Sequence, residues 1–176
     1  MSKESLKKKL IIGTAGGYAP FVSMNDLGTY EGFDIDIAQA IAENMNIELE
    51  IKDIGSMSSL FIALEQGKID AIIWALSITQ ERINKVTMVR YQGDNTKSYS
   101  IMCWKQTPYN ATSINELKNT TICVEAGSCQ EVALNKYPFI KKLSINHVDD
   151  GLLNIQYQKA DGVLVEPTIA KKFKKK

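Results

Sequence analysis

Two polar segments of this sequence, residues 12–21 and 74–82, each follow apolar residues typical of a strand and contain side chains suited to holding a small ligand. Open α/β sheets bind small molecules in loops at the ends of their strands. The second segment ends in Arg82, whose planar guanidinium can bind a carboxylate through two parallel hydrogen bonds. Near the other end of the chain, Glu166 follows an apolar run at 162–165. The chain therefore offers one cation and one anion for a ligand that carries both charges.

Together with residues 32–38, these segments resemble the bacterial extracytoplasmic solute-binding proteins of family 3, which deliver polar amino acids to ABC importers. The resemblance covers nearly the whole chain. It implies an α/β fold of two lobes, the type II fold of periplasmic binding proteins, with a ligand cleft between the lobes. It also implies a periplasmic or cell-surface location, a membrane permease as partner, and neither a cofactor nor a catalytic residue.

A closed pocket must pair both charges of a free amino acid, because an unpaired buried charge costs on the order of several kcal/mol. The resemblance assigns the ligand carboxylate to Arg82 and the ligand ammonium to Glu166, on opposite lobes. For Arg82 the alternative is an ion pair with Glu81 or Asp70. For Glu166 the alternative, which does not exclude the first role, is an acid in the first turn of a helix begun by Pro167.

Residues 127–129 are expected to form the junction between a strand and a helix. There, the backbone N–H groups of Gly127, Ser128 and Cys129 would share the ligand carboxylate. The structural alternative is a tight turn at Gly127 with Ser128 as the helix cap. Catalysis by Cys129 is not expected, because the only histidine, His147, is predicted to lie in a strand at the surface.

The resemblance also places Tyr18, Met57, Trp74, Ala75 and Ser77 in the ligand pocket. Tyr18 matches a ring that covers the aliphatic part of the ligand, and Met57 replaces a second aromatic residue. Trp74 replaces a small residue and should narrow or cap the pocket. Met57 and Trp74 are interpreted equally well as core residues.

Ligand specificity is the least determined feature of the sequence. Relatives that bind basic amino acids usually have an acid in the first loop, where this chain has Ala15. Glu125 could compensate by facing a cationic side chain, and an exposed loop acid without a ligand role is the alternative. The ligand class predicted is a free polar or basic amino acid.

The elements that must position these residues follow from hydrophobic periodicity. A strand at 10–14, a helix through 33–45 and a strand at 47–51 form a β-α-β unit. A second helix, marked by Leu60 and Leu64, should end at Gly67.

An apolar run at 69–74 is typical of a buried parallel strand, and residues 159–165 repeat its pattern. Two lobes of similar construction are therefore predicted: 1–98 as lobe 1, 99–106 as a strand crossing between lobes, and 107–176 as lobe 2. Lobe 2 should hold strands at 121–124 and 143–148.

In the family, the chain returns from lobe 2 and ends in helices packed on lobe 1, whereas this sequence ends at Lys176. We therefore expect a C-terminally incomplete fold, with apolar surface on lobe 1 available for self-association. Two alternatives to transport remain open. One is an enzyme of the same fold, similar to cyclohexadienyl dehydratase, and the other is a fragment that depends on assembly or does not bind.

Composition agrees with a globular protein of 176 residues, with 44% hydrophobic residues, 23% charged residues and a net charge of +1. A nearly neutral chain gives no reason to expect a nucleic-acid partner. The basic N-terminus lacks an apolar stretch and a cleavage site, as expected where a signal has been removed or is missing. Cys103, Cys123 and Cys129 are odd in number and lack metal-ligand spacing, so neither a disulfide framework nor a metal site is predicted.

Overall fold

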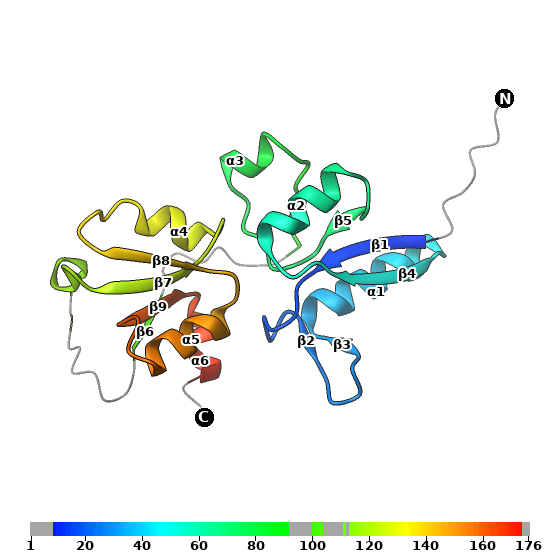
Figure 1. Cartoon of the computed structure of the whole chain (residues 1–176). Coiled ribbons are helices and arrows are strands. Elements are labelled where there is room, and N and C mark those ends of the chain that lie inside the picture. The colour runs from blue at the N-terminus through cyan, green and yellow to red at the C-terminus, as the bar shows by residue number, and fades with distance from the viewer. Residues whose placement is uncertain (1–8, 92–99, 104–110, 112, 174–176) are drawn as a thin grey trace. The chain divides into compact units, whose positions relative to one another are not determined.

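A computed structural model describes residues 9–91, 100–103, 111 and 113–173. The chain divides into two compact units, Met1–Leu76 and Ser77–Lys176. Each unit contains a β-sheet with helices packed against it (Figure 1).

The first unit is built on a three-stranded parallel sheet with the order β4-β1-β5. Its strands are β1 (Lys9–Thr14), β4 (Glu48–Asp53) and β5 (Ala71–Ile72), and a separate antiparallel pair is formed by β2 (Ser23–Met24) and β3 (Tyr30–Glu31). Its helices are α1 (Phe33–Met45) and α2 (Met57–Glu65). The predicted β-α-β unit and second helix are confirmed, and β5 is shorter than the apolar run that predicted it.

Strand β1 is covered on both of its faces. On one face, a Cβ added to Gly13 would lie 3.0 Å from the Leu60 side chain of α2 and closer still to Ile69, so the helix packs directly on the backbone. On the other face, Leu10 and Ile12 are 9% and 2% exposed. The expectation of an uncovered sheet in lobe 1 is therefore wrong for β1, and self-association stays a prediction.

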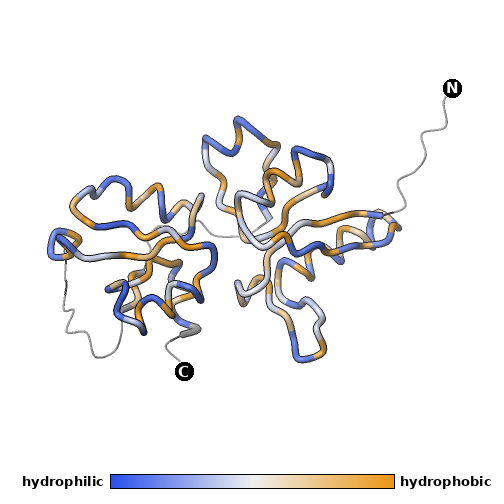
Figure 2. The backbone as a smooth tube through the Cα atoms, in the orientation of Figure 1, coloured by the Kyte–Doolittle hydropathy of each residue, from blue (hydrophilic) through white to orange (hydrophobic). Residues whose placement is uncertain are grey.

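The face of helix α1 that packs on the core is not the face that carries its large apolar residues. The buried residues are Asp34, Ala38 and Ala42, whereas Phe33 and Met45 are 43% and 57% exposed. Alanine side chains let the helix approach the sheet closely, and the larger apolar residues remain toward solvent. Hydrophobic and hydrophilic positions alternate along the helices of both units (Figure 2).

The second unit contains a four-stranded sheet with the order β6-β9-β7-β8. Strand β6 (Ser100–Cys103) is antiparallel to β9 (Gly162–Val165), while β7 (Thr121–Glu125) is parallel to both β9 and β8 (Lys141–Ile145). The remaining elements are α3 (Gln80–Ile83), the 3-10 helix η1 (Ile114–Leu117), α4 (Cys129–Leu134), α5 (Val148–Gln156) and α6 (Pro167–Phe173).

The strand predicted at 143–148 ends earlier than expected. Strand β8 stops at Ile145, and His147 is the N-cap of α5, where its backbone N–H donates to Oδ2 of Asp150 at 3.2 Å. The interpretation of His147 as a strand residue is therefore wrong. Acids in the first turn of α5 favour the helix because they interact with the positive end of its dipole.

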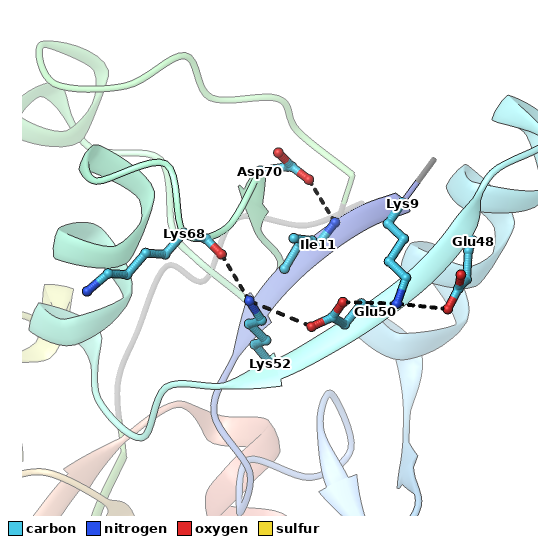
Figure 3. A network of polar contacts seen from close by, with 7 residues as sticks. All are labelled: Lys9, Ile11, Glu48, Glu50, Lys52, Lys68 and Asp70. Atoms are coloured by element: carbon cyan, nitrogen blue, oxygen red, sulfur yellow. Dashed lines mark hydrogen bonds and ion pairs between the residues drawn. The ribbon is translucent and has the colours of Figure 1, made fainter. Parts of the chain in front are cut away.

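The sequence repeat between 68–74 and 159–165 corresponds to a repeated contact. The backbone N–H of Ile11 donates to Oδ2 of Asp70 at 2.8 Å, and the N–H of Asp70 donates to the Ile11 carbonyl at 2.7 Å (Figure 3). Asp161 makes the same two bonds with Thr121, at 2.7 and 2.8 Å. In each unit an aspartate thus fixes the start of the last parallel strand against its neighbour.

Charged side chains along β1 and β4 form an exposed network beside the Asp70 contact (Figure 3). Nζ of Lys9 lies 3.1 Å from Glu48 and 3.5 Å from Glu50, and Lys52 lies 3.6 Å from Glu50. Exposed ion pairs of this kind contribute about 0 to 1 kcal/mol each. The network therefore adds little to the stability of the sheet.

The predicted lobe boundary at 98 lies outside the described residues, and so does half of the crossing strand at 99–106. Of that strand, β6 is described, and it belongs to the sheet of the second unit. The compact units divide between Leu76 and Ser77, and the predicted lobe bounds stay a prediction. Helix α3 and Arg82 therefore belong to the second unit, whereas the sequence placed them in the first lobe.

Candidate ligand-binding site

In the first unit, the loop after β1 is tied down by one carboxylate. Oδ2 of Asp53, at the end of β4, accepts hydrogen bonds from the Gly16 N–H and the Tyr30 hydroxyl, both at 2.9 Å. Its Oδ1 accepts from the Gly55 N–H at 2.8 Å. Burial and these contacts with Asp53 raise the pKa of Tyr30. The loop that leads to Tyr18 is therefore fixed at its first turn.

Tyr18 joins the aromatic core of the first unit. Its ring lies 5.9 Å from that of Phe21 and 5.7 Å from that of Trp74, measured between centroids. Trp74 is 3% exposed and Met57 is 8% exposed, and both belong to the buried cluster of this unit together with Ala15. These positions agree with the core interpretation of Met57 and Trp74, and their contact with a ligand stays a prediction.

Ala75 is held in an unusual backbone conformation by a buried acid. Its φ of 46° lies in the left-handed region, which an alanine rarely adopts, and its N–H donates to Oδ2 of Asp34 at 2.5 Å. Asp34 is fully buried at the start of α1. The segment 32–38 thus fixes the backbone after β5, a positioning role that sequence reasoning did not assign to Asp34.

We expect Asp34→Ala to destabilise the first unit, because the buried N–H of Ala75 would lose its acceptor. Leaving such a group unpaired costs about 1 to 3 kcal/mol. Asp36→Ala is the matched control, since Asp36 also lies in the first turn of α1 but is exposed. Urea unfolding followed by circular dichroism measures both. Equal losses of stability for the two variants would contradict the positioning role.

In the second unit, Arg82 is buried and fixed by backbone groups. It is 8% exposed, its Nη1 donates to the Ser77 carbonyl at 2.8 Å, and its Nη2 donates to the Gly127 carbonyl at 2.9 Å. The hydroxyl of Thr79 caps α3 by accepting from the Arg82 N–H at 3.2 Å. The guanidinium is therefore buried and oriented by two backbone carbonyls. Glu81 pairs with Lys85 at 2.8 Å.

The junction at 127–129 is structured differently from the anion-binding group that the sequence predicted. The Gly127 N–H donates to Oε2 of Glu131 at 2.8 Å, and the Ser128 N–H faces the Glu125 carbonyl at 3.2 Å. The Ser128 hydroxyl donates to that carbonyl at 2.6 Å and caps α4 by accepting from the Glu131 N–H at 3.1 Å. These N–H groups are used within the junction, so for Gly127 and Ser128 the structural alternative describes the geometry.

Cys129 is the first residue of α4 and, like Cys123, is a free thiol. Burial raises the pKa of the Cys123 thiol, so that group remains protonated at neutral pH. The structure assigns no chemical step to either of these two described thiols. A role for Cys129 in ligand binding stays a prediction.

Two carboxyl groups lie at the ends of adjacent strands, and Arg82 and Glu166 both act on one of them, Glu125. Glu125 ends β7, and Glu166 directly follows β9 and precedes α6, which begins at Pro167 as predicted. Burial and the nearby Glu166 carboxylate raise the pKa of Glu125 to about 7, against the opposing effect of Arg82. Burial also raises the pKa of Glu166. Glu125 is therefore not the exposed loop acid that was weighed as the alternative.

The raised pKa of Glu125 predicts that the protein loses stability as pH rises from about 4.5 to about 7. In this interval the folded state holds a proton that the unfolded state has already released, so each step up in pH favours unfolding. Glu125→Gln should remove this part of the pH dependence. Between pH 5 and pH 8, the free energy of unfolding of the variant should therefore rise by about 2 kcal/mol relative to that of the parent. Urea unfolding at both pH values measures it. Parallel stability curves for the two proteins would contradict the assigned protonation.

Comparison with known proteins identifies the family of the chain. Residues 10–165 match the bacterial extracellular solute-binding proteins, family 3. The chain belongs to this family. Its relatives include the probable ABC transporter arginine-binding protein ArtJ of Chlamydia trachomatis, 28% identical over 95% of this chain, and the arginine-binding extracellular protein ArtP of Bacillus subtilis, 30% identical over 97%. The chain spans 63% and 66% of the length of these two relatives.

Solved structures of similar fold include amino-acid-binding proteins. Holo ArgBP from T. maritima has a TM-score of 0.87 and 28% identity, with 94% of this chain and 72% of that one covered. An ancestral arginine-binding protein bound to glutamine has a TM-score of 0.83 and 26% identity, with 97% and 74% covered. The two-lobed α/β fold class predicted from the sequence is confirmed by these neighbours.

No helix in the described ranges of the chain is both long enough and apolar enough to cross a membrane. Within the same ranges, no group of three or more His, Cys, Asp or Glu side chains is placed to hold a metal ion.

Proposed function

We propose that this chain binds a free amino acid, polar or basic, and delivers it to an ABC importer. The observation that carries the proposal is the buried guanidinium of Arg82, held by two backbone carbonyls near Glu125, on which the Glu166 carboxylate also acts. A fixed cation next to fixed anions suits a ligand with a carboxylate and an ammonium. The ligand carboxylate is assigned to Arg82 and the ammonium to Glu166.

The relatives support the ligand class and the partner. Both ArtJ and ArtP are named arginine-binding, and a further relative, 28% identical, is the histidine-binding periplasmic protein of Escherichia coli. We carry over from them a basic amino acid as the first ligand to test, a membrane permease as partner, and a location outside the cytoplasmic membrane. We propose binding without turnover, since no residue of the site is assigned a catalytic role.

Isothermal titration calorimetry with this chain tests the proposal. We expect arginine, histidine or glutamine to bind, and arginine amide and agmatine to bind far more weakly, because the first has a blocked carboxylate and the second has none. Binding of agmatine as tight as that of arginine would remove the carboxylate from the recognised groups. If the folded chain binds none of the free amino acids, the proposed function is wrong.

A further inference from the structure

The three charged groups of the second unit come from separate elements. Strands β7 and β9 are parallel neighbours in which Cys123 pairs with Val163. Glu125 and Glu166 therefore both lie at the carboxyl ends of these strands. Arg82 comes from α3 and is linked to the turn after β7 through its bond to the Gly127 carbonyl at 2.9 Å. Glu166 and Arg82 are the charged groups that act on Glu125.

Other charged groups packed near the end of β7 are occupied elsewhere. Glu131 of α4 is paired with Lys142 at 2.8 Å and accepts from the Gly127 N–H. Asp150 of α5 accepts from the His147 N–H at 3.2 Å. Glu131 and Asp150 therefore contact groups other than Glu125.

The charges of this cluster do not balance when all three groups are ionised. One guanidinium then faces two carboxylates, which leaves an excess of one negative charge in a partly buried place. An amino acid with a neutral side chain brings one carboxylate and one ammonium, so its binding leaves the excess unchanged. A basic amino acid brings one further positive charge, and a proton on one carboxyl group has the same effect.

We propose that Glu125 sets the charge of the ligand: as a carboxylate it pairs with the cationic side chain of a basic amino acid, and as the protonated acid it allows a neutral amino acid to bind. This inference rests on the proposed function and names the residue that recognises the charge of the ligand side chain. The proton balance is simple. When a cationic ligand binds, the O–H bond of the Glu125 carboxyl breaks, and the proton passes to the buffer while the electron pair stays on the carboxylate.

Glu125 rather than Glu166 is the group that exchanges the proton. Its pKa is raised to about 7 by burial and by Glu166, so near neutral pH both forms are present in the free protein. A cationic side chain stabilises the carboxylate and lowers that pKa. Glu166 keeps its carboxylate because the ligand ammonium pairs with it for either class of ligand.

Arginine and citrulline provide a direct test, because citrulline replaces the guanidinium with an uncharged urea group of nearly the same shape. Calorimetry at pH 7, in phosphate and in Tris, gives the number of protons exchanged from the difference in apparent enthalpy. We expect arginine binding to release about half a proton, and citrulline binding, which favours the protonated acid, to take up about half a proton. For the parent, the ratio of arginine to citrulline affinity should rise by at least about tenfold between pH 5.5 and pH 8.5.

Variants then identify the residue. Glu125→Gln should weaken arginine binding by at least about 30-fold, change citrulline binding by less than about threefold, and abolish the proton release. Glu81→Gln is the matched control, because it removes the same type of side chain as Glu125→Gln. Glu81 lies on the same helix as Arg82 but is exposed. It should leave both affinities and the proton release unchanged.

The outcomes separate this inference from the proposed function. Equal binding of arginine and citrulline at all pH values, with no proton exchanged, would overturn the inference and leave amino-acid binding intact. Equal losses for both ligands in Glu125→Gln would also overturn it. Should that variant fail to fold, the pH dependence of the parent alone decides the matter. If no amino acid binds the folded parent, the proposed function and the inference both fail.

Discussion

Replacing Arg82 with alanine is expected to weaken amino-acid binding by roughly two to four decades. Removing one member of a buried charge pair costs about 3 to 5 kcal/mol, because the remaining charge is left without a partner. Here the remaining charge would be the ligand carboxylate. The guanidinium is already oriented by the Ser77 and Gly127 carbonyls, so little ordering entropy is lost when the ligand binds.

Two further variants show whether charge or geometry is needed. Arg82→Lys keeps the positive charge but loses the planar fork, and we expect it to recover only part of the affinity. Lys85→Ala removes an exposed cation that pairs with Glu81 next to Arg82 and should bind normally. Calorimetry measures affinity, and circular dichroism checks that each variant is folded. Binding by Arg82→Ala within about threefold of the parent would show that the carboxylate is held by another group.

Periodicity predicted the strands and helices of both units well, because the buried positions are apolar and regularly spaced. It failed on the orientation of α1, where small residues and one buried acid face the core while Phe33 and Met45 are exposed. Hydrophobic size alone cannot reveal such a face, since alanine packs closely without contributing much to an apolar pattern. It also failed at His147, where a helix cap follows directly on a strand.

The candidate site was predictable where motif and strand end coincide, and less so where tertiary contacts decide. Arg82 and Glu166 were named from the sequence, and their ligand roles stay predictions. The pairing of Asp34 with Ala75 joins residues distant in the chain and leaves no local signal. Glu125 was named from the sequence as an acid that could face a cationic side chain, but its raised pKa depends on burial and on Glu166 from another strand and has no local signal. At the 127–129 junction, the motif suggested free N–H groups, but a glutamate one helical turn later takes that of Gly127.

The second large effect is expected for Glu166→Gln, which should weaken binding of arginine by about two decades through loss of the partner of the α-ammonium. An arginine analogue without the α-amino group carries no such ammonium. Its affinity should therefore change by less than about threefold in this variant. Glu125→Gln should show the reverse selectivity, since it concerns the ligand side chain, which the analogue retains.

Crossing the two variants with the two ligands, in four calorimetric titrations beside the parent, assigns each carboxyl group to one end of the ligand. Glu166→Asp provides the conservative control, because it keeps the charge at the end of β9 and should recover part of the arginine affinity. Glu166 also contributes its backbone carbonyl to α6, accepting from the Ala170 N–H at 3.0 Å, and this bond does not depend on the side chain. A fold defect would lower the affinity of both ligands together in Glu166→Gln. That result would remove Glu166 from the site, whereas a selective loss of arginine binding would place it at the ammonium.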